Sequence, residues 1–111
     1  MINDHKYYAI IVAGGSGTRM RSSVPKQYLL LNGIPLLMHT INAFDVCATK
    51  PGIILVLHPD SHDYWNQLCE EYNFTVPHQL VSGGETRFHS VRNGINMIED
   101  DDAIVAIHDA V

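Results

Sequence analysis

Three apolar runs constrain the fold of this 111-residue chain more than any other feature. We expect them to form strands at residues 6–13, 53–57 and 103–107, each far shorter than the roughly 20 apolar residues of a membrane helix. A strand that is apolar along its whole length is buried on both faces, which is typical of parallel sheets covered by helices. The runs therefore favour a parallel sheet that is covered by helices.

Helical patterns separate these strands. Apolar residues recur with helical spacing over 35–46, 61–73 and 85–99, and a shorter apolar run over 78–81 predicts one more strand. We expect the last of these helices to bury four apolar side chains, Phe88, Val91, Ile95 and Ile98.

The alternation of strand and helix predicts a Rossmann-like, mostly parallel sheet with helices on both faces. Asn32-Gly33 interrupts the pattern and predicts a tight hairpin within 28–34, because this pair is the strongest two-residue turn signal. We see no interdomain linker and expect a single domain.

A glycine-rich loop over residues 14–26 follows the first strand and precedes two cations. Glycine permits unusual backbone angles and close approach, so successive N–H groups in such a loop can converge on an anion. Backbone donors and nearby cations are what a nucleoside triphosphate needs. The residues concerned are Gly14, Gly15, Gly17, Arg19 and Lys26.

Two familiar phosphate loops do not fit this stretch. No Gly-Lys pair occurs in the chain, which excludes a P-loop, and Met20 stands where the dinucleotide fingerprint requires its third glycine. Taken alone, the loop leaves an ordinary flexible turn as an open alternative.

Two further polar features follow predicted strands, the turn Ser82-Gly83-Gly84 and the pair His108-Asp109. Ligands of parallel α/β folds bind at the carboxyl ends of the strands, where both features and the glycine loop lie. From the residues alone, each could also be a simple turn or helix cap.

The motifs resemble those of nucleotidyltransferases that activate polyol phosphates with CTP, above all the 2-C-methyl-D-erythritol 4-phosphate cytidylyltransferase family. The likeness rests on Ala-Gly-Gly-x-Gly-x-Arg-Met from Ala13, on Pro-Lys-Gln-Tyr-Leu from Pro25, on Gly-Gly-x-x-Arg-x-x-Ser-Val from Gly83 and on His-Asp-Ala from His108. It covers nearly the whole chain.

The resemblance implies a role for each matching residue. Arg19 and Lys26 are expected to be catalytic, and Asp109 to hold Mg²⁺ that bridges the triphosphate. Arg87 is expected to support the nucleoside loop, in which Glu85 replaces a frequent aspartate. The residues expected to contact CTP are Ala13, Gly14, Gly15, Ser16, Gly17, Gly84, Glu85, Ser90 and Ala110.

The implied reaction converts CTP and 2-C-methyl-D-erythritol 4-phosphate to CDP-methylerythritol and pyrophosphate in non-mevalonate isoprenoid synthesis. A cytidylyltransferase for another polyol phosphate, such as ribitol 5-phosphate, is the near alternative, and a non-catalytic nucleotide-binding domain is the distant one. We expect residues 1–111 to be the N-terminal CTP-binding part of one domain, inactive without the remainder and its dimerisation arm. The intact protein is expected to be a homodimer.

Composition adds limits on partners and compartment. The net charge of −5 argues against a broad nucleic-acid surface, and no stretch predicts a signal peptide or membrane span. Cys47 and Cys69 are too few for a disulfide framework and favour the cytoplasm. His58 and His62 have a metal-like spacing, but Pro59 excludes a helix that contains both, which disfavours a zinc site.

Overall fold

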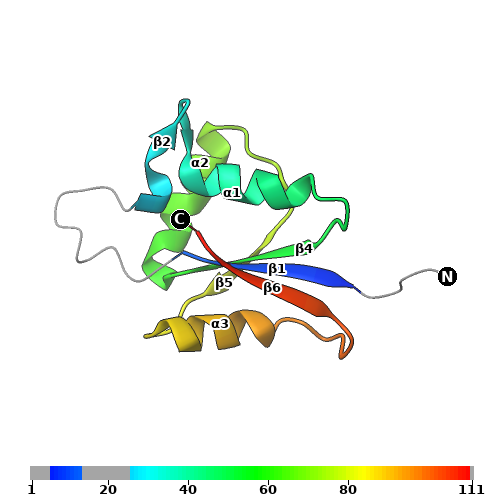
Figure 1. The fold of residues 1–111 in the computed structure, drawn as a ribbon. Helices are drawn as coiled ribbons and strands as arrows, with labels where there is room; N and C mark the ends of the chain where they lie inside the picture. Colours follow the sequence, from blue (N-terminus) through cyan, green and yellow to red (C-terminus); the bar gives the residue numbers. More distant parts are fainter. Residues whose placement is uncertain (1–5, 14–25, 111) are drawn as a thin grey trace.

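The computed structural model describes residues 6–13 and 26–110, and every structural statement below refers to these residues. Their centre is a parallel sheet of four strands in the order β5-β4-β1-β6, drawn in Figure 1. The strands span Tyr7–Val12 (β1), Gly52–Leu57 (β4), Gln79–Ser82 (β5) and Ile104–Asp109 (β6).

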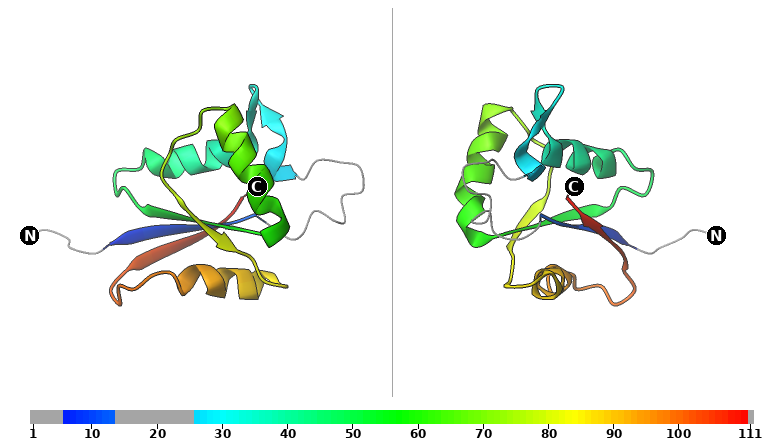
Figure 2. Two further views of the ribbon diagram at one scale, coloured as in Figure 1. Left: turned by 180° about the vertical axis from the view of Figure 1, so that it is seen from behind. Right: turned by 60° about the vertical axis from the view of Figure 1, so that its left-hand side comes forward.

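Helices cover both faces of the sheet. Helices α1 (Leu36–Asp45) and α2 (His62–Glu71) lie on one face and α3 (Arg87–Ile95) lies on the other, as the two views in Figure 2 show. The described part also contains two short 3₁₀ turns, η2 (Lys26–Tyr28) and η3 (Pro59–Ser61). The predicted α/β class is confirmed, and these strands and helices begin and end within about two residues of the expected positions, except for α3.

The inner strands divide the core by the alternation of their side chains. Strand β1 pairs with β4 and β6, and Ile10 lies opposite Ile54 on one side and Ile107 on the other. Ile11 and Leu55 belong to a core shared with α1 and α2, whereas their neighbours belong to a smaller core against α3. Burial on both faces explains why β1 and β4 have no polar position to alternate with their apolar ones.

The predicted hairpin is confirmed. Strands β2 (Leu30–Leu31) and β3 (Ile34–Pro35) pair antiparallel around the turn at Asn32 and Gly33. Both turn residues have positive φ, 55° and 80°, which is the geometry of a two-residue hairpin turn that follows the strand twist.

Helix α3 differs from its prediction. It is shorter than 85–99, and Phe88 and Ile95 are 68% and 44% exposed, so the prediction that they face inward was wrong. The buried positions of this helix are the small residues Ser90 and Gly94. A Cβ at Gly94 would lie 2.9 Å from Cγ2 of Ile10, so the helix backbone rests almost directly on the sheet.

Both cysteines are free thiols. Cys69 packs against the larger core, and burial raises its pKa to about 11, so the thiol is protonated at neutral pH.

None of the helices in the described ranges combines the length and the apolar character that a membrane crossing requires.

A buried polar contact anchors α2 to the segment that precedes β5. The Trp65 indole is fully buried, and its Nε1–H donates a 3.0 Å hydrogen bond to Nε2 of His78. Nδ1 of His78 lies 2.8 Å from the carbonyl oxygen of Val76, so the same imidazole donates there and accepts from the indole. This arrangement selects one neutral tautomer of His78.

We predict that His78→Phe destabilises the protein by about 1–3 kcal/mol, because the buried indole N–H then has no acceptor. Denaturant unfolding followed by far-ultraviolet circular dichroism measures the change, because the control removes Trp65, the one tryptophan in the chain. Trp65→Phe combined with His78→Phe is the control, and the pair should cost less than the two single changes added together. A cost below about 0.5 kcal/mol for His78→Phe would contradict the assigned hydrogen bond.

Candidate functional site

Main-chain hydrogen bonds bring the predicted site segments to one end of the sheet. The amide of Ala13 donates to Val56, and that of Gly83 donates to Leu57, over 3.1 and 2.7 Å. On the other side of β1, the amide of Ala110 donates to Val12 over 2.9 Å. Residues that follow β1, β5 and β6 are thus tied to neighbouring strands at their carboxyl ends. The strand order also reverses next to β1, the position at which parallel sheets bind ligands.

A direct contact joins two of the predicted site residues. Nε of Arg87, the first residue of α3, lies 3.0 Å from Oδ1 of Asp109, the last residue of β6. Both side chains are more than half exposed, so the ion pair adds little stability, roughly 0–1 kcal/mol. Its consequence is positional, because it connects the turn before α3 to the end of β6.

A second contact shapes the turn that carries Gly84. Its amide donates a 3.0 Å hydrogen bond to Oγ of Ser90, whose side chain is buried. In this structure Ser90 therefore orders the turn, while Glu85 is exposed beside it. Ser90 also lies one helical turn beyond Arg87, as residues three apart in a helix do.

Two residues that the sequence reasoning did not select hold the start of α3. Oγ1 of Thr86 accepts the amide N–H of His89 over 3.2 Å and so caps the helix. The same hydroxyl lies 2.8 Å from Nδ1 of His89. Threonine immediately before a helix is a recognised N-cap signal and could have identified this role.

Lys26 lies in a short turn that is fixed by a buried residue at its other end. It begins η2, and its side chain is exposed, whereas Tyr28 at the end of the turn is 5% exposed. The Tyr28 ring packs edge-to-face on Tyr64 of α2, with a centroid distance of 5.0 Å. Burial raises the pKa of the Tyr28 hydroxyl, so the base of the turn stays uncharged.

Part of the predicted site lies outside the described residues. These predictions concern Gly14, Gly15, Ser16, Gly17 and Arg19. Ala13, the last described residue before them, is buried at the end of β1.

The surroundings of Asp109 fit a magnesium ion. Its carboxylate is 60% exposed, and Arg87 contacts one of its two oxygens, which leaves ligand capacity on the other. Magnesium binds through one or two carboxylates together with phosphate oxygens, so a single accessible aspartate suffices.

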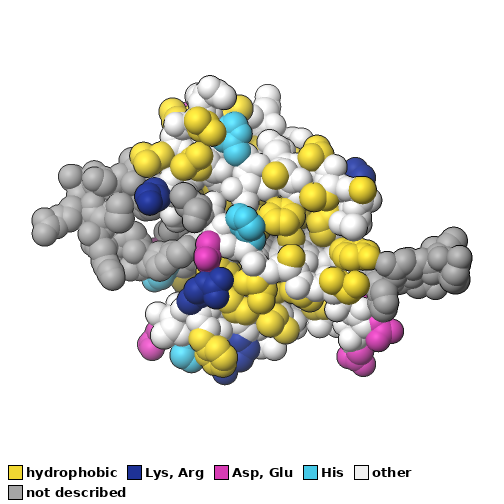
Figure 3. All heavy atoms as spheres, viewed as in Figure 1, with side chains coloured by type: hydrophobic (Ala, Val, Ile, Leu, Met, Phe, Trp, Pro, Cys, Tyr) yellow, Lys and Arg dark blue, Asp and Glu magenta, His cyan; other side chains and the backbone are white. Residues whose placement is uncertain are grey.

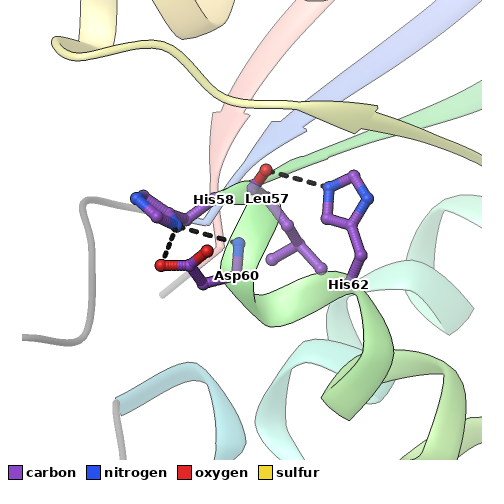
Figure 4. Close-up of polar contacts among 4 residues, drawn as sticks. All are labelled: Leu57, His58, Asp60 and His62. Atoms are coloured by element: carbon purple, nitrogen blue, oxygen red, sulfur yellow. Dashed lines mark hydrogen bonds and ion pairs between the residues drawn. The ribbon is translucent and has the colours of Figure 1, made fainter.

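A zinc site at His58 and His62 is disfavoured by the structure as well. The two rings point to opposite sides of Leu57, as Figure 4 shows. Within the described ranges, no group of three or more His, Cys, Asp and Glu side chains is placed to hold a metal.

Comparison with known proteins identifies the family. The family model for IspD, 2-C-methyl-D-erythritol 4-phosphate cytidylyltransferase, matches residues 7–111. The chain belongs to the IspD family. The match includes all the segments that meet at the carboxyl ends of the strands, and the resemblance inferred from the motifs is confirmed.

Relatives of this IspD-family chain carry the same name. The 2-C-methyl-D-erythritol 4-phosphate cytidylyltransferase of Porphyromonas gingivalis is 52% identical over 97% of this chain and 47% of its own length. The protein of that name from Bacteroides thetaiotaomicron is 50% identical over 96% of this chain and 48% of its own length. The chain thus spans about half the length of the curated relatives it matches.

Solved structures agree on the fold. The 4-diphosphocytidyl-2C-methyl-D-erythritol synthase of Anaerococcus prevotii superposes with a TM-score of 0.72 at 29% identity, covering 96% of this chain and 44% of that one. The bifunctional IspDF of Campylobacter jejuni gives a TM-score of 0.73 over 95% of this chain and 26% of its own, and at 23% identity it supports the fold alone.

We predict that Gly84→Ala disturbs the turn before α3, because the added Cβ would overlap with Cβ of His89. A clash of this kind costs about 1–3 kcal/mol of unfolding free energy, which denaturant titration measures. Glu85→Ala is the matched control, since it changes an exposed side chain of the same segment. Equal stability of the Gly84 variant and the unchanged protein would contradict the described turn.

Proposed function

We propose that this chain supplies the CTP-binding part of a 2-C-methyl-D-erythritol 4-phosphate cytidylyltransferase. The observation that carries the proposal is the meeting of Ala13, Gly83 and Ala110 at the carboxyl ends of the strands, with Arg87 bound to Asp109 across the same end. Membership in the IspD family supports the same activity.

In the proposed reaction, an oxygen of the acceptor phosphate attacks the α-phosphorus of CTP in line. The bond between the α-phosphorus and the bridging oxygen breaks, and pyrophosphate leaves. A phosphate monoester is already a competent nucleophile, so catalysis consists mainly of positioning and stabilisation of charge. Arg19 and Lys26 provide that positive charge in the proposal, and the main chain of 13–17 cradles the phosphates.

The turn before α3 takes the nucleoside in this scheme. Gly84, Glu85 and Ser90 face it, Arg87 supports the turn, and Ala110 adjoins the ribose. Because Ser90 binds the amide of Gly84 in this structure, we assign it the task of ordering the turn for the base.

Asp109 is the residue that would hold Mg²⁺. The ion, when bound, would neutralise charge on the triphosphate. Arg87 keeps the Asp109 carboxylate at the end of β6 and on the side that faces α3.

The acceptor, assembly and compartment belong to the same proposal. We propose 2-C-methyl-D-erythritol 4-phosphate as the acceptor, a homodimer as the functional assembly and the cytoplasm as the compartment. The experiment that tests the function uses the intact enzyme, in which residues 1–111 are joined to the remainder of the domain. It measures Mg²⁺-dependent release of pyrophosphate from CTP, with 2-C-methyl-D-erythritol 4-phosphate and ribitol 5-phosphate as alternative acceptors. Release that depends on the first acceptor supports the proposal, and nucleotide binding without release from either acceptor contradicts it.

We predict that Lys26→Ala in the intact enzyme lowers kcat by at least a hundredfold and leaves the fold intact, because an exposed cation that acts on the transition state adds little to stability. Steady-state pyrophosphate release measures kcat, and thermal unfolding tests the fold. Lys6→Ala is the matched control, since Lys6 is exposed at the opposite, amino end of β1. A loss below about threefold for Lys26→Ala would remove this residue from the mechanism.

A further inference from the structure

His58 occupies the end of β4, between two segments of the proposed site. It directly follows Leu57, which accepts the amide of Gly83, and it lies two residues after Val56, which accepts the amide of Ala13. The sequence reasoning considered this histidine for zinc only. Its position places it between the main chain proposed for the phosphates and the turn proposed for the nucleoside.

The local structure determines which nitrogen of His58 carries a proton. Nδ1 accepts the amide N–H of Asp60 over 3.0 Å and so caps the η3 turn. In the neutral ring the proton is therefore on Nε2. Within the described part of the chain Nε2 has no hydrogen-bond partner, and the side chain is one-third exposed at 33%.

The Asp60 carboxylate does not contact Nε2 of His58. The Asp60 carboxylate, whose side chain is 87% exposed, lies 3.7 Å from Nδ1 of His58, on the same nitrogen as the cap. Figure 4 shows the His58 ring projecting beyond the end of β4, with both Asp60 contacts at Nδ1. Nε2 is thus left as a fixed donor at the edge of the site.

His62 provides an internal contrast. Its Nε2 lies 3.1 Å from the carbonyl oxygen of Leu57, so its ring folds back on the backbone. In Figure 4 the two rings lie on opposite sides of Leu57. One histidine of the pair is committed to the fold, and the other presents a donor to the surroundings.

We propose that Nε2–H of His58 donates a hydrogen bond to an acceptor oxygen of the bound nucleotide. The inference rests on the proposed function, since it requires a nucleotide at this end of the sheet. A phosphate oxygen and the carbonyl oxygen of cytosine have the chemistry to accept this bond, and the phosphate is the stronger acceptor because it is charged. His58 then has two separable tasks, the cap through Nδ1 and the nucleotide contact through Nε2.

Two substitutions separate these tasks in the purified protein. His58→Asn places an amide oxygen near the position of Nδ1 and keeps the cap, but it loses the Nε2 donor. His58→Gln places an amide N–H₂ near the position of Nε2 and keeps the donor, but it loses the cap. Calorimetric titration with CTP and Mg²⁺ gives the affinity, and thermal unfolding gives the stability.

We expect His58→Asn to weaken CTP binding about tenfold with unchanged stability, as for the loss of one hydrogen bond to a charged group. His58→Gln should retain most of the affinity and lose stability. His62→Ala is the matched control and should leave the affinity for CTP unchanged. Titration with cytidine locates the acceptor, because a loss confined to CTP assigns it to the phosphates and an equal loss assigns it to the base.

The opposite ranking overturns the inference. If His58→Asn binds CTP as the unchanged protein does, or if affinity follows stability across the variants, His58 is only a cap. If the unchanged protein itself does not bind CTP, the proposed function fails before His58 is tested, so the two failures are distinguishable.

Discussion

Burial of β1 on both faces is the constraint on which the rest of the structure depends. Ile10 and Ile11 point to opposite sides, and both are fully buried, so helices must cover the sheet above and below. Helices α1 and α2 meet this need on one face and α3 meets it on the other. The reversal of strand order beside β1 follows, because the chain crosses to the far side of β1 only after α3.

The site is a consequence of that layout. Parallel strands end at the same edge, and the amides that follow them bind carbonyls of their neighbours, so separate segments meet without a cross-link. The small residues of α3 add to this effect, since Gly94 lets the helix lie close to the sheet and Ser90 ties the preceding turn. Arg87 can then reach Asp109 across the strand ends.

Strand β6 is more exposed than the inner strands of the sheet. It forms one edge of the described sheet, and Ile104 and Ile107 are each 44% exposed. Figure 3 shows apolar side chains gathered over this part of the molecule. The apolar run of β6 therefore does not predict burial on both faces as the runs of β1 and β4 do, because most of its residues are exposed.

Sequence reasoning was most successful where one local rule dominates. Continuous apolar runs predicted the buried strands, and Asn32-Gly33 predicted the hairpin, because each depends on neighbouring residues alone. It failed on Phe88 and Ile95, since an apolar stripe was taken for the buried face when Ser90 and Gly94 pack there instead. The Arg87–Asp109 contact and the tautomer of His58 depend on tertiary geometry, which spacing in the sequence does not contain.

The central claim is that the segments at the carboxyl ends of the strands jointly bind one nucleotide. Amide chemical-shift mapping of isotopically labelled protein during titration with CTP and Mg²⁺ tests it most directly. The account predicts that the amides of Ala13, Gly84 and Ala110 shift with one common dissociation constant, while Gly52, at the amino end of β4, does not respond. Shifts centred on the amino ends of the strands, or confined to one of the three segments, would contradict it.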